Sequence, residues 1–140
     1  MDSKQKDLQR KRLGAEGEEQ ACRVLQERGY EILRRNFRSG HKEIDIICRD
    51  GADLRFVEVK TRREPVEGEA WEAVDMAKQR RIARVAGSFL SSLVSTSEKN
   101  GGRRFYPEEC HFDIITIVWD RDGNYSRTDY IQDAFYLMYT

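Results

Sequence analysis

Two acidic residues and one lysine are spaced along the chain in a way that suits metal-ion chemistry. Asp45 lies in the segment KEIDII, and Glu58 and Lys60 lie in the segment FVEVKT. Because side chains alternate between the two faces of a β-strand, Glu58 and Lys60 share one face. Neighbouring carboxylates repel unless a cation lies between them, and their oxygens suit a hard ion such as Mg²⁺. The alternative is an ordinary amphipathic strand whose Glu and Lys face water.

Whether Asp45 meets Glu58 depends on the turn that joins the two strands. This turn contains the hairpin signal Asp50-Gly51. A loop of these two residues places Asp45 opposite the position two residues before Glu58, whereas a four-residue loop from Asp50 to Asp53 places it opposite Glu58 itself. In both registers the two carboxylates lie on one face, roughly 5–8 Å apart. A three-residue loop would separate them.

Two predicted helices each place one charged side chain on an apolar face. At about 100° per residue, Glu18 falls in the middle of the packing face of a helix predicted over Leu13–Arg28. Lys78 falls at the centre of the apolar stripe of a second helix, formed by Trp71, Val74, Ile82, Val85 and Phe89. A charge that faces a core must be paired or must bind a ligand, so both residues are candidates for the hairpin site. An ordinary buried ion pair or a snorkelling side chain is the alternative for each.

The elements that would position these residues follow from the hydrophobic pattern and the turn residues. Gly29 is expected to end the first helix, and 95–102 to follow the second as a loop. The predicted strands are Tyr30–Phe37, Glu43–Arg49, Leu54–Thr61, Cys110–Trp119 and Tyr125–Tyr130, with 131–139 either helix or strand. The order αβββαββ predicts an α/β fold with a central mixed sheet flanked by helices. Residues 1–12 are expected to be flexible and 13–140 to form one domain.

Composition limits the class of protein. The 140 residues are 39% hydrophobic with a mean hydropathy of -0.78, which suits one folded domain. Because 25 Lys and Arg balance 25 Asp and Glu, any surface for nucleic acid must arise from local segregation of charge. Three cysteines without a CxxC pair argue against a disulfide framework or a zinc site. No apolar run approaches the roughly 18 residues of a membrane span, so we expect a cytoplasmic protein without membrane contact.

Several motifs together resemble the YraN family of bacterial proteins, over about residues 13–137. They are Gly17-Glu18, Arg35-Asn36, Lys42-Glu43-Ile44-Asp45-Ile46-Ile47, Phe56-Val57-Glu58-Val59-Lys60-Thr61-Arg62, the helix of Lys78, and Phe112-Asp113. This family is similar to archaeal Holliday-junction resolvases of the PD-(D/E)XK nuclease superfamily. The chain departs from the family pattern at Lys42 and His111, where glycine and arginine are usual.

The resemblance implies a restriction-endonuclease-like fold and a site for Mg²⁺ or Mn²⁺. Asp45, Glu58 and Glu18 would then be the metal ligands. Lys60 would position or activate the attacking water, and Lys78 is a further candidate for the catalytic site. The bound ion would lower the pKa of that water and neutralise charge on the scissile phosphate.

Other polar residues have weaker claims to a role. Arginines at strand ends near the site could hold phosphates or could simply be solvated; they are Arg34, Arg35, Arg38, Arg62 and Arg63. Asp113 lies inside an apolar strand, and we expect it to form a buried structural pair rather than to bind the metal. His41 is either a loop residue or a proton shuttle.

Three functions fit this sequence. The first is a Mg²⁺-dependent endonuclease for branched or otherwise structured DNA. The second is a nucleic-acid-binding module that keeps the fold but has little or no activity, and the third is an interaction protein whose acidic hairpin merely binds a cation. The presence of Glu18, Asp45, Glu58 and Lys60 together favours the first. A homodimer would match a symmetric DNA junction, and the sequence leaves both the oligomeric state and the choice between DNA and RNA open.

Overall fold

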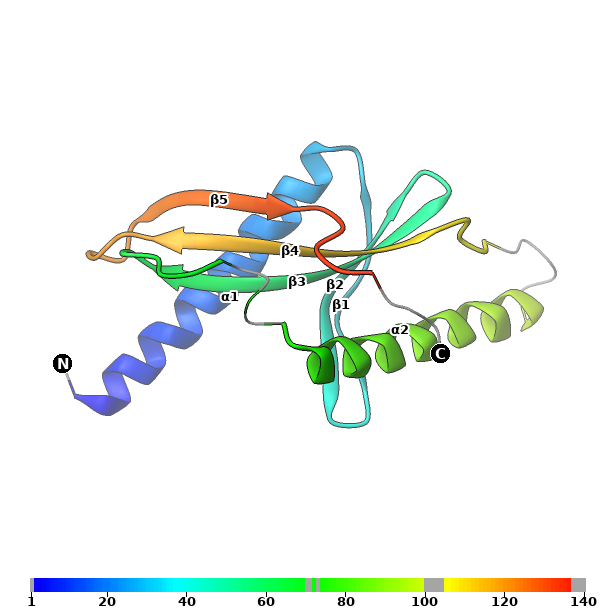
Figure 1. Cartoon of the computed structure of the whole chain (residues 1–140), viewed down its shortest axis with the longest axis horizontal. Helices are drawn as coiled ribbons and strands as arrows, with labels where there is room; N and C mark the ends of the chain where they lie inside the picture. The colour runs from blue at the N-terminus through cyan, green and yellow to red at the C-terminus, as the bar shows by residue number, and fades with distance from the viewer. Residues whose placement is uncertain (1, 70–71, 73, 100–104, 137–140) are drawn as a thin grey trace.

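The computed structural model describes residues 2–69, 72, 74–99 and 105–136. It confirms the predicted order of elements, an α/β fold in which two helices flank one five-stranded mixed sheet (Figure 1). The strands follow one another across the sheet in chain order, and only β3 and β4 are parallel. The elements are α1 (Ser3–Glu27), β1 (Glu31–Ser39), β2 (Lys42–Asp50), β3 (Asp53–Arg63), α2 (Met76–Lys99), β4 (Cys110–Trp119) and β5 (Tyr125–Ile131).

The two helices cover opposite faces of the sheet. On one face α1 buries Ala21 and Leu25 against Ile46, Val57 and Ile115. On the other face α2 buries a second apolar cluster, which includes Ile44, Phe56, Ile82, Val85 and Phe89. A sheet covered on both sides explains why β4 is an almost continuous apolar run rather than an alternating one. A charged side chain in the middle of this sheet is therefore surrounded by apolar residues.

Helix α1 begins at Ser3, which places 3–12 in the helix rather than in a flexible segment. A capping box fixes this start, because the Asp2 side chain accepts a hydrogen bond from the Gln5 backbone and the Gln5 side chain accepts one from the Asp2 backbone. The first half of the helix lies beyond the sheet, where Figure 1 shows the N-terminus. Gly29, with φ +86°, ends the helix in the left-handed conformation, as predicted.

Helix α2 begins at Met76, after an Asp75 side chain that accepts a hydrogen bond from the Lys78 backbone. The prediction began this helix too early, because Val74 is buried but precedes it, while Trp71 lies outside the described residues. It also ended the helix too early, since the helix continues to Lys99. The segment predicted as a terminal helix or strand has neither structure beyond Ile131, as far as residue 136.

The β1–β2 hairpin turns steeply away from the direction of β4 and β5 (Figure 1). The pairing of β2 with β3 runs from Asp50↔Asp53 to Ile46↔Val57 and ends there. Beyond this point the two strands diverge, and the gap between them is where the predicted site residues meet.

Two expected absences can be compared with the described residues. Cys22, Cys48 and Cys110 are all free thiols, which agrees with the prediction that no disulfide framework exists. Within the described parts of the chain, neither helix carries an apolar stretch that could span a bilayer.

Candidate metal centre

Asp45 occupies the point where β2 leaves β3. The observed register, continued by one position beyond Ile46↔Val57, sets Asp45 opposite Glu58, which is the arrangement predicted for the longer of the two turns. The Asp45 carboxylate enters the gap and accepts a hydrogen bond from the Val59 backbone at 2.8 Å. The Asp45 side chain thus accepts the hydrogen bond of a β3 backbone amide in the region where β2 no longer pairs with β3.

The backbone around Asp45 is irregular in a way that the alternation rule does not anticipate. Regular alternation would place Ile44 and Ile46 on one face, yet they belong to the cores on opposite faces of the sheet. The break coincides with Asn36 on β1, which has φ +52° and lies between the pairs Arg35↔Ile46 and Phe37↔Ile44. Asparagine is one of the few residues that tolerates the left-handed region. The irregularity changes which face of the sheet the side chains of β2 meet on either side of Asp45.

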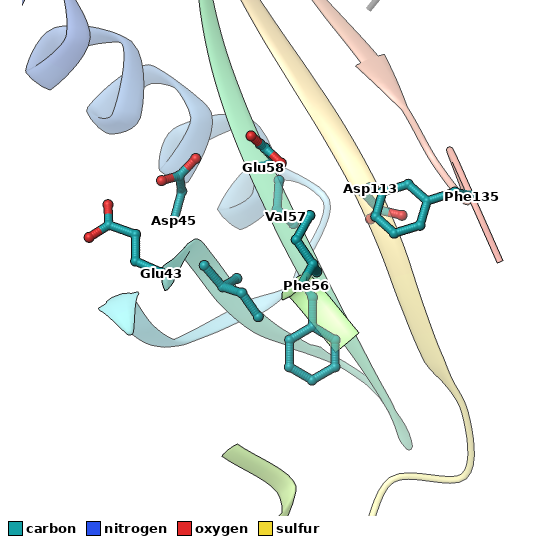
Figure 2. Close-up of a pocket in the computed structure, with 9 residues that line it drawn as sticks. Glu43, Asp45, Phe56, Val57, Glu58, Asp113 and Phe135 are labelled. Carbon is teal, nitrogen blue, oxygen red and sulfur yellow. The ribbon is translucent and has the colours of Figure 1, made fainter. Parts of the chain in front are cut away.

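Three carboxylates converge at this point. One oxygen each from Glu18, Glu43 and Asp45 lies within 4.8 Å of the others. Figure 2 shows Glu43 and Asp45 on β2, with Glu58 on the neighbouring strand. The predicted ligands Glu18 and Asp45 are therefore brought together, and Glu43 joins them. Glu43 was not assigned to the metal from the sequence, because its approach to Glu18 depends on the tertiary structure.

Glu58 has a different partner. Its carboxylate forms an ion pair with Lys78 of α2, which confirms that Lys78 faces inward and explains how a lysine is accommodated on an apolar helix face. The third predicted ligand thus lies beside the carboxylate cluster but is held by a cation of the protein itself. Lys60 interacts electrostatically with the same side chains. Burial and the neighbouring charge of Lys78 lower the pKa of Lys60, while the charges of Glu58 and Asp45 act in the opposite direction.

The surroundings of Asp45 disfavour the charged form of its carboxylate. Burial raises its pKa from 3.8 to about 7, and the charges of Glu58, Glu18 and Glu43 add to this increase. The hydrogen bond from Val59 opposes the shift without cancelling it. A carboxylate that is desolvated and surrounded by like charges must either hold a proton or bind a positive ion.

The residues present fit a hard divalent cation. A cavity of about 40 Å³ is lined by Glu43, Asp45 and Glu58 together with apolar side chains such as Ile44 and Phe56, and Glu18 lies outside this lining. A water molecule needs roughly 10–15 Å³ of such space. The donors are carboxylate oxygens, which suit Mg²⁺ and Mn²⁺ rather than Zn²⁺ or copper. Glu18, Asp45 and Glu43 would hold the ion, with Glu58 next to them.

Two of the predicted phosphate-binding arginines contact the carboxylate cluster. Arg35 binds Glu19 at 2.6 Å and Glu18 at 3.7 Å, and Arg38 binds Glu43 at 3.0 Å. Asn36 also donates to Glu18, at 3.5 Å. These side chains orient the acidic residues, a role that the sequence did not suggest for them.

Two more of the five predicted arginines, Arg62 and Arg63, lie at the far end of β3, whereas Arg34 of β1 lies over the ring of Phe37. The Arg63 guanidinium donates hydrogen bonds to the backbone carbonyls of Asp120 and Arg121. Arg62 is half-buried and pairs with no carboxylate of the described residues. This pair of arginines is therefore separate from the acidic cluster.

Two further predictions have clear outcomes. Asp113 is almost fully buried and accepts hydrogen bonds from Arg55, the Tyr130 hydroxyl and the Asp133 backbone, so the interpretation as a structural pair is confirmed. His41 lies exposed in the turn between β1 and β2, outside the carboxylate cluster.

Comparisons with known proteins give the chain its family. The model of the family described as Uncharacterised protein family UPF0102 matches residues 17–117, a range that includes Glu18, Asp45, Glu58 and Lys78. A UPF0102 protein of Symbiobacterium thermophilum is 42% identical over 126 residues, which are 90% of this chain and 98% of the relative.

Two further relatives agree. A UPF0102 protein of Chlorobaculum tepidum is 51% identical over 106 residues, which are 76% of this chain and 74% of the relative. A UPF0102 protein of Rhodococcus jostii is 40% identical over 123 residues, which are 88% of this chain and 95% of the relative. The chain therefore belongs to the UPF0102 family, also called YraN, as the motifs in its sequence had indicated.

Proposed function

We propose that this protein is a metal-dependent endonuclease, which hydrolyses phosphodiester bonds of nucleic acid with Mg²⁺ or Mn²⁺. The observation that carries the proposal is the convergence of Glu18, Glu43 and Asp45 within 4.8 Å, next to two lysines. Carboxylates placed to hold a cation and lysines placed to meet an anion are the two halves of a phosphodiesterase site. A merely structural cation site has no use for the second half.

Each side chain has a task in this reaction. When bound, the divalent ion supplies a water molecule of lowered pKa and neutralises charge on the scissile phosphate. Lys60 orients the attacking water, and its lowered pKa increases the fraction of neutral amine that can accept a proton at Nζ. Lys78, already paired with Glu58, provides positive charge for the phosphate oxygens. Arg35 and Arg38 hold Glu18 and Glu43 in place.

The choice of substrate rests on the resemblance to Holliday-junction resolvases, which supports branched DNA as the substrate class. A panel of linear, flapped and four-way DNA and RNA, incubated with Mg²⁺, Mn²⁺ or EDTA, tests both parts. We expect cleavage of branched DNA with either metal and none with EDTA. Asp45→Asn and Lys60→Ala should each lower the rate at least roughly a hundredfold, whereas Asp129→Asn, on an exposed position of β5, should leave it unchanged.

The contrary result is also informative. If the wild type binds the panel with salt-dependent affinity but cleaves none of it under any metal, the protein is a binding module and the proposal is wrong. If it neither binds nor cleaves, the carboxylate cluster serves another purpose.

Metal binding can be measured without a substrate. Calorimetry with Mn²⁺ should show one site that is lost in Asp45→Ala and Glu18→Ala, and weakened in Glu58→Ala. Because burial keeps Asp45 protonated up to about pH 7 in the metal-free protein, binding should release a proton and be weaker at pH 6 than at pH 8. Equal affinity at both pH values would contradict the role given to Asp45.

A further inference from the structure

A second concave region lies between the first half of α1 and the far end of β3. It has a volume of about 960 Å³, and four cationic side chains and one carboxylate line it. The cations are Lys6, Arg10, Arg62 and Arg63, and the carboxylate is Asp122. We name this region the basic groove. Its lining carries three net positive charges, the difference between four and one, in a chain whose net charge is zero.

The charges of the basic groove are not neutralised by the protein. Lys6, Arg10 and Arg62 form no ion pair with any described residue. Arg63 donates only to backbone carbonyls, which fix the position of its guanidinium without cancelling its charge. Elsewhere the arginines Arg35, Arg38, Arg55 and Arg127 are paired with carboxylates. Unpaired cations held in a concavity are suited to an anionic ligand.

The helix geometry assigns only some of its basic residues to the groove. Lys6, Gln9, Arg10 and Leu13 of α1 line it, and these positions lie on one face of a helix with about 100° per residue. Lys4 and Lys11 lie on the opposite face and are exposed. Leu13 and Trp119, both buried, form an apolar base. The capped extension of α1 beyond the sheet is thus what builds one wall.

We propose that the basic groove binds the sugar-phosphate backbone of a nucleic-acid strand that extends from the candidate metal centre. This inference rests on the proposed function for the identity of the ligand. Lys60 of β3 is followed along the strand by Thr61, Arg62 and Arg63, which line the groove. Glu18 lies on the same helix as Lys6 and Arg10, so the candidate metal centre and the groove are neighbours along both β3 and α1. Phosphate contacts of this kind fix position and affinity but read no sequence.

The shape of the groove favours a strand over a membrane surface. A helix that lies on a bilayer presents a broad apolar face, whereas in the first half of α1 the only large apolar side chain strongly exposed among the described residues is Leu8. The cations Lys6, Arg10, Arg62 and Arg63 line a concave region rather than a flat surface, a shape that suits a strand better than a flat bilayer.

A matched pair of variants tests the groove. Lys6→Ala with Arg10→Ala removes two charges from the groove face of α1, and Lys4→Ala with Lys11→Ala removes two charges from the opposite face of the same helix. Alanine favours helix in all four positions. Fluorescence anisotropy with labelled single-stranded and duplex DNA, in EDTA and over a range of salt, gives the affinity of each full-length protein.

We expect the groove variant to bind roughly tenfold to a hundredfold more weakly, with a salt dependence that is smaller by about two phosphate contacts. The opposite-face variant should stay within about twofold of the wild type. Arg62→Gln, on the other wall, should weaken binding of the same probe, and the single-stranded and duplex probes show which form the groove prefers.

Three results would overturn the inference. Equal losses in the two helix variants would mean that only the overall charge of α1 matters, and no loss in either would mean that the groove is not used. Binding to vesicles of anionic phospholipid without binding to DNA would assign the surface to a membrane. Because these measurements exclude metal, they remain valid if the protein proves to have no nuclease activity, and cleavage can fail while groove binding persists.

Discussion

Asp45 on β2 and Asp113 on β4 belong to the same sheet, yet their carboxylates have opposite surroundings. Asp113 is 1% exposed, and its carboxylate accepts hydrogen bonds from Arg55, from the Tyr130 hydroxyl at 2.5 Å and from the Asp133 backbone at 2.9 Å. Asp45 is less buried, accepts one backbone hydrogen bond and faces further carboxylates. The more deeply buried acid is the better compensated one.

The difference lies in the groups that surround each carboxylate. Around Asp113 every neighbour is a donor, and burial together with this carboxylate raises the pKa of Tyr130, so the hydroxyl remains protonated and continues to donate. Around Asp45 the neighbouring charges of Glu58, Glu18 and Glu43 repel its carboxylate, which must either hold a proton or bind a positive ion. Burial alone does not distinguish the two acids, whereas the sign of what surrounds them does.

Removal of Asp113 should have the largest effect on stability. Asp113→Ala leaves the buried guanidinium of Arg55 with Asp50 as its one remaining carboxylate partner among the described residues and removes the acceptor of the Tyr130 hydroxyl, which together cost about 3–5 kcal/mol. Urea unfolding followed by circular dichroism measures this loss. The double variant Arg55→Met with Asp113→Leu should recover much of the stability, because no charge is then left buried. A single variant as stable as the wild type would show that the cluster is not structural.

Removal of the Asp45 charge should increase the stability of the metal-free protein, whereas removal of Asp113 decreases it. In EDTA the wild type should lose stability as the pH rises from about 4 toward 7, since the folded-state pKa of Asp45 is raised from 3.8 to about 7 and the contribution of the protonated acid disappears over that range. Asp45→Asn has no such loss and should be more stable at pH 8, by on the order of 2 kcal/mol after allowance for partial exposure.

Unfolding at pH 4.5 and pH 8 checks this expectation, with Asp129→Asn as the matched control on an exposed strand position. Saturating Mn²⁺ should stabilise the wild type but not Asp45→Asn at pH 8. A variant less stable than the wild type at pH 8 would place Asp45 in the same class as Asp113.

Lys78 should have a smaller effect, on metal affinity. It neutralises Glu58 from within the protein, so Lys78→Met removes a positive charge that opposes the approach of a cation. Mn²⁺ should then bind roughly threefold to tenfold more tightly, while cleavage becomes slower because the phosphate loses a partner. Tighter Mn²⁺ binding with an unchanged cleavage rate would mean that Lys78 neutralises Glu58 in the metal-free protein but does not contact the phosphate.

Substitution of His111, a charged group that the protein compensates with its own carboxylates, should give the smallest effect on stability. Its ring lies between Asp133 at 2.6 Å and Asp53 at 3.0 Å. Burial acts against protonation of His111, but the hydrogen bonds to Asp53 and Asp133 outweigh it and raise the pKa above 6.5. The stabilisation is therefore present below about pH 6.5 and is lost as the pH rises through the folded-state pKa.

His111→Asn should consequently cost about 1 kcal/mol at pH 6 and much less at pH 9. Unfolding in urea at the two pH values measures the difference. An equal cost at both pH values would mean that the ring contributes through packing rather than through its charge.

Much of the fold and part of the site could be predicted from the sequence because they depend on local periodicity. The inward positions of Glu18 and Lys78 and the limits of β4 follow from repeating patterns, and the register that sets Asp45 opposite Glu58 is one of the two favourable registers that the hairpin allowed. The N-terminal extension of α1 was missed because its polar residues carry no apolar stripe, although the capping pair Asp2 and Gln5 was visible in the sequence.

The rest of the site depends on tertiary geometry. The convergence of Glu43 with Glu18 needs the broken alternation near Asn36 and the end of the β2–β3 pairing, and neither is a property of a single strand. The pairing of Glu58 with Lys78 rather than with the acidic cluster likewise depends on where α2 crosses the sheet. Arg35 and Arg38 were expected to meet phosphate, whereas the fold turns them toward carboxylates.

Gly17 determines how the two functional regions of α1 are related. A side chain at this position would approach Thr61 Oγ1 to 3.1 Å and Ile117 to 3.6 Å, so the helix lies in close contact with the sheet here. Glu18 is the next residue, whereas Lys6 lies about 16 Å along the axis at 1.5 Å per residue. A stiff rod tilted about such a pivot moves least beside the pivot and most at its free end. Gly17→Ala would therefore displace Lys6 and Arg10 in the wall of the basic groove more than Glu18, so a change in the angle of this one helix would alter the groove and leave the candidate metal centre almost unchanged.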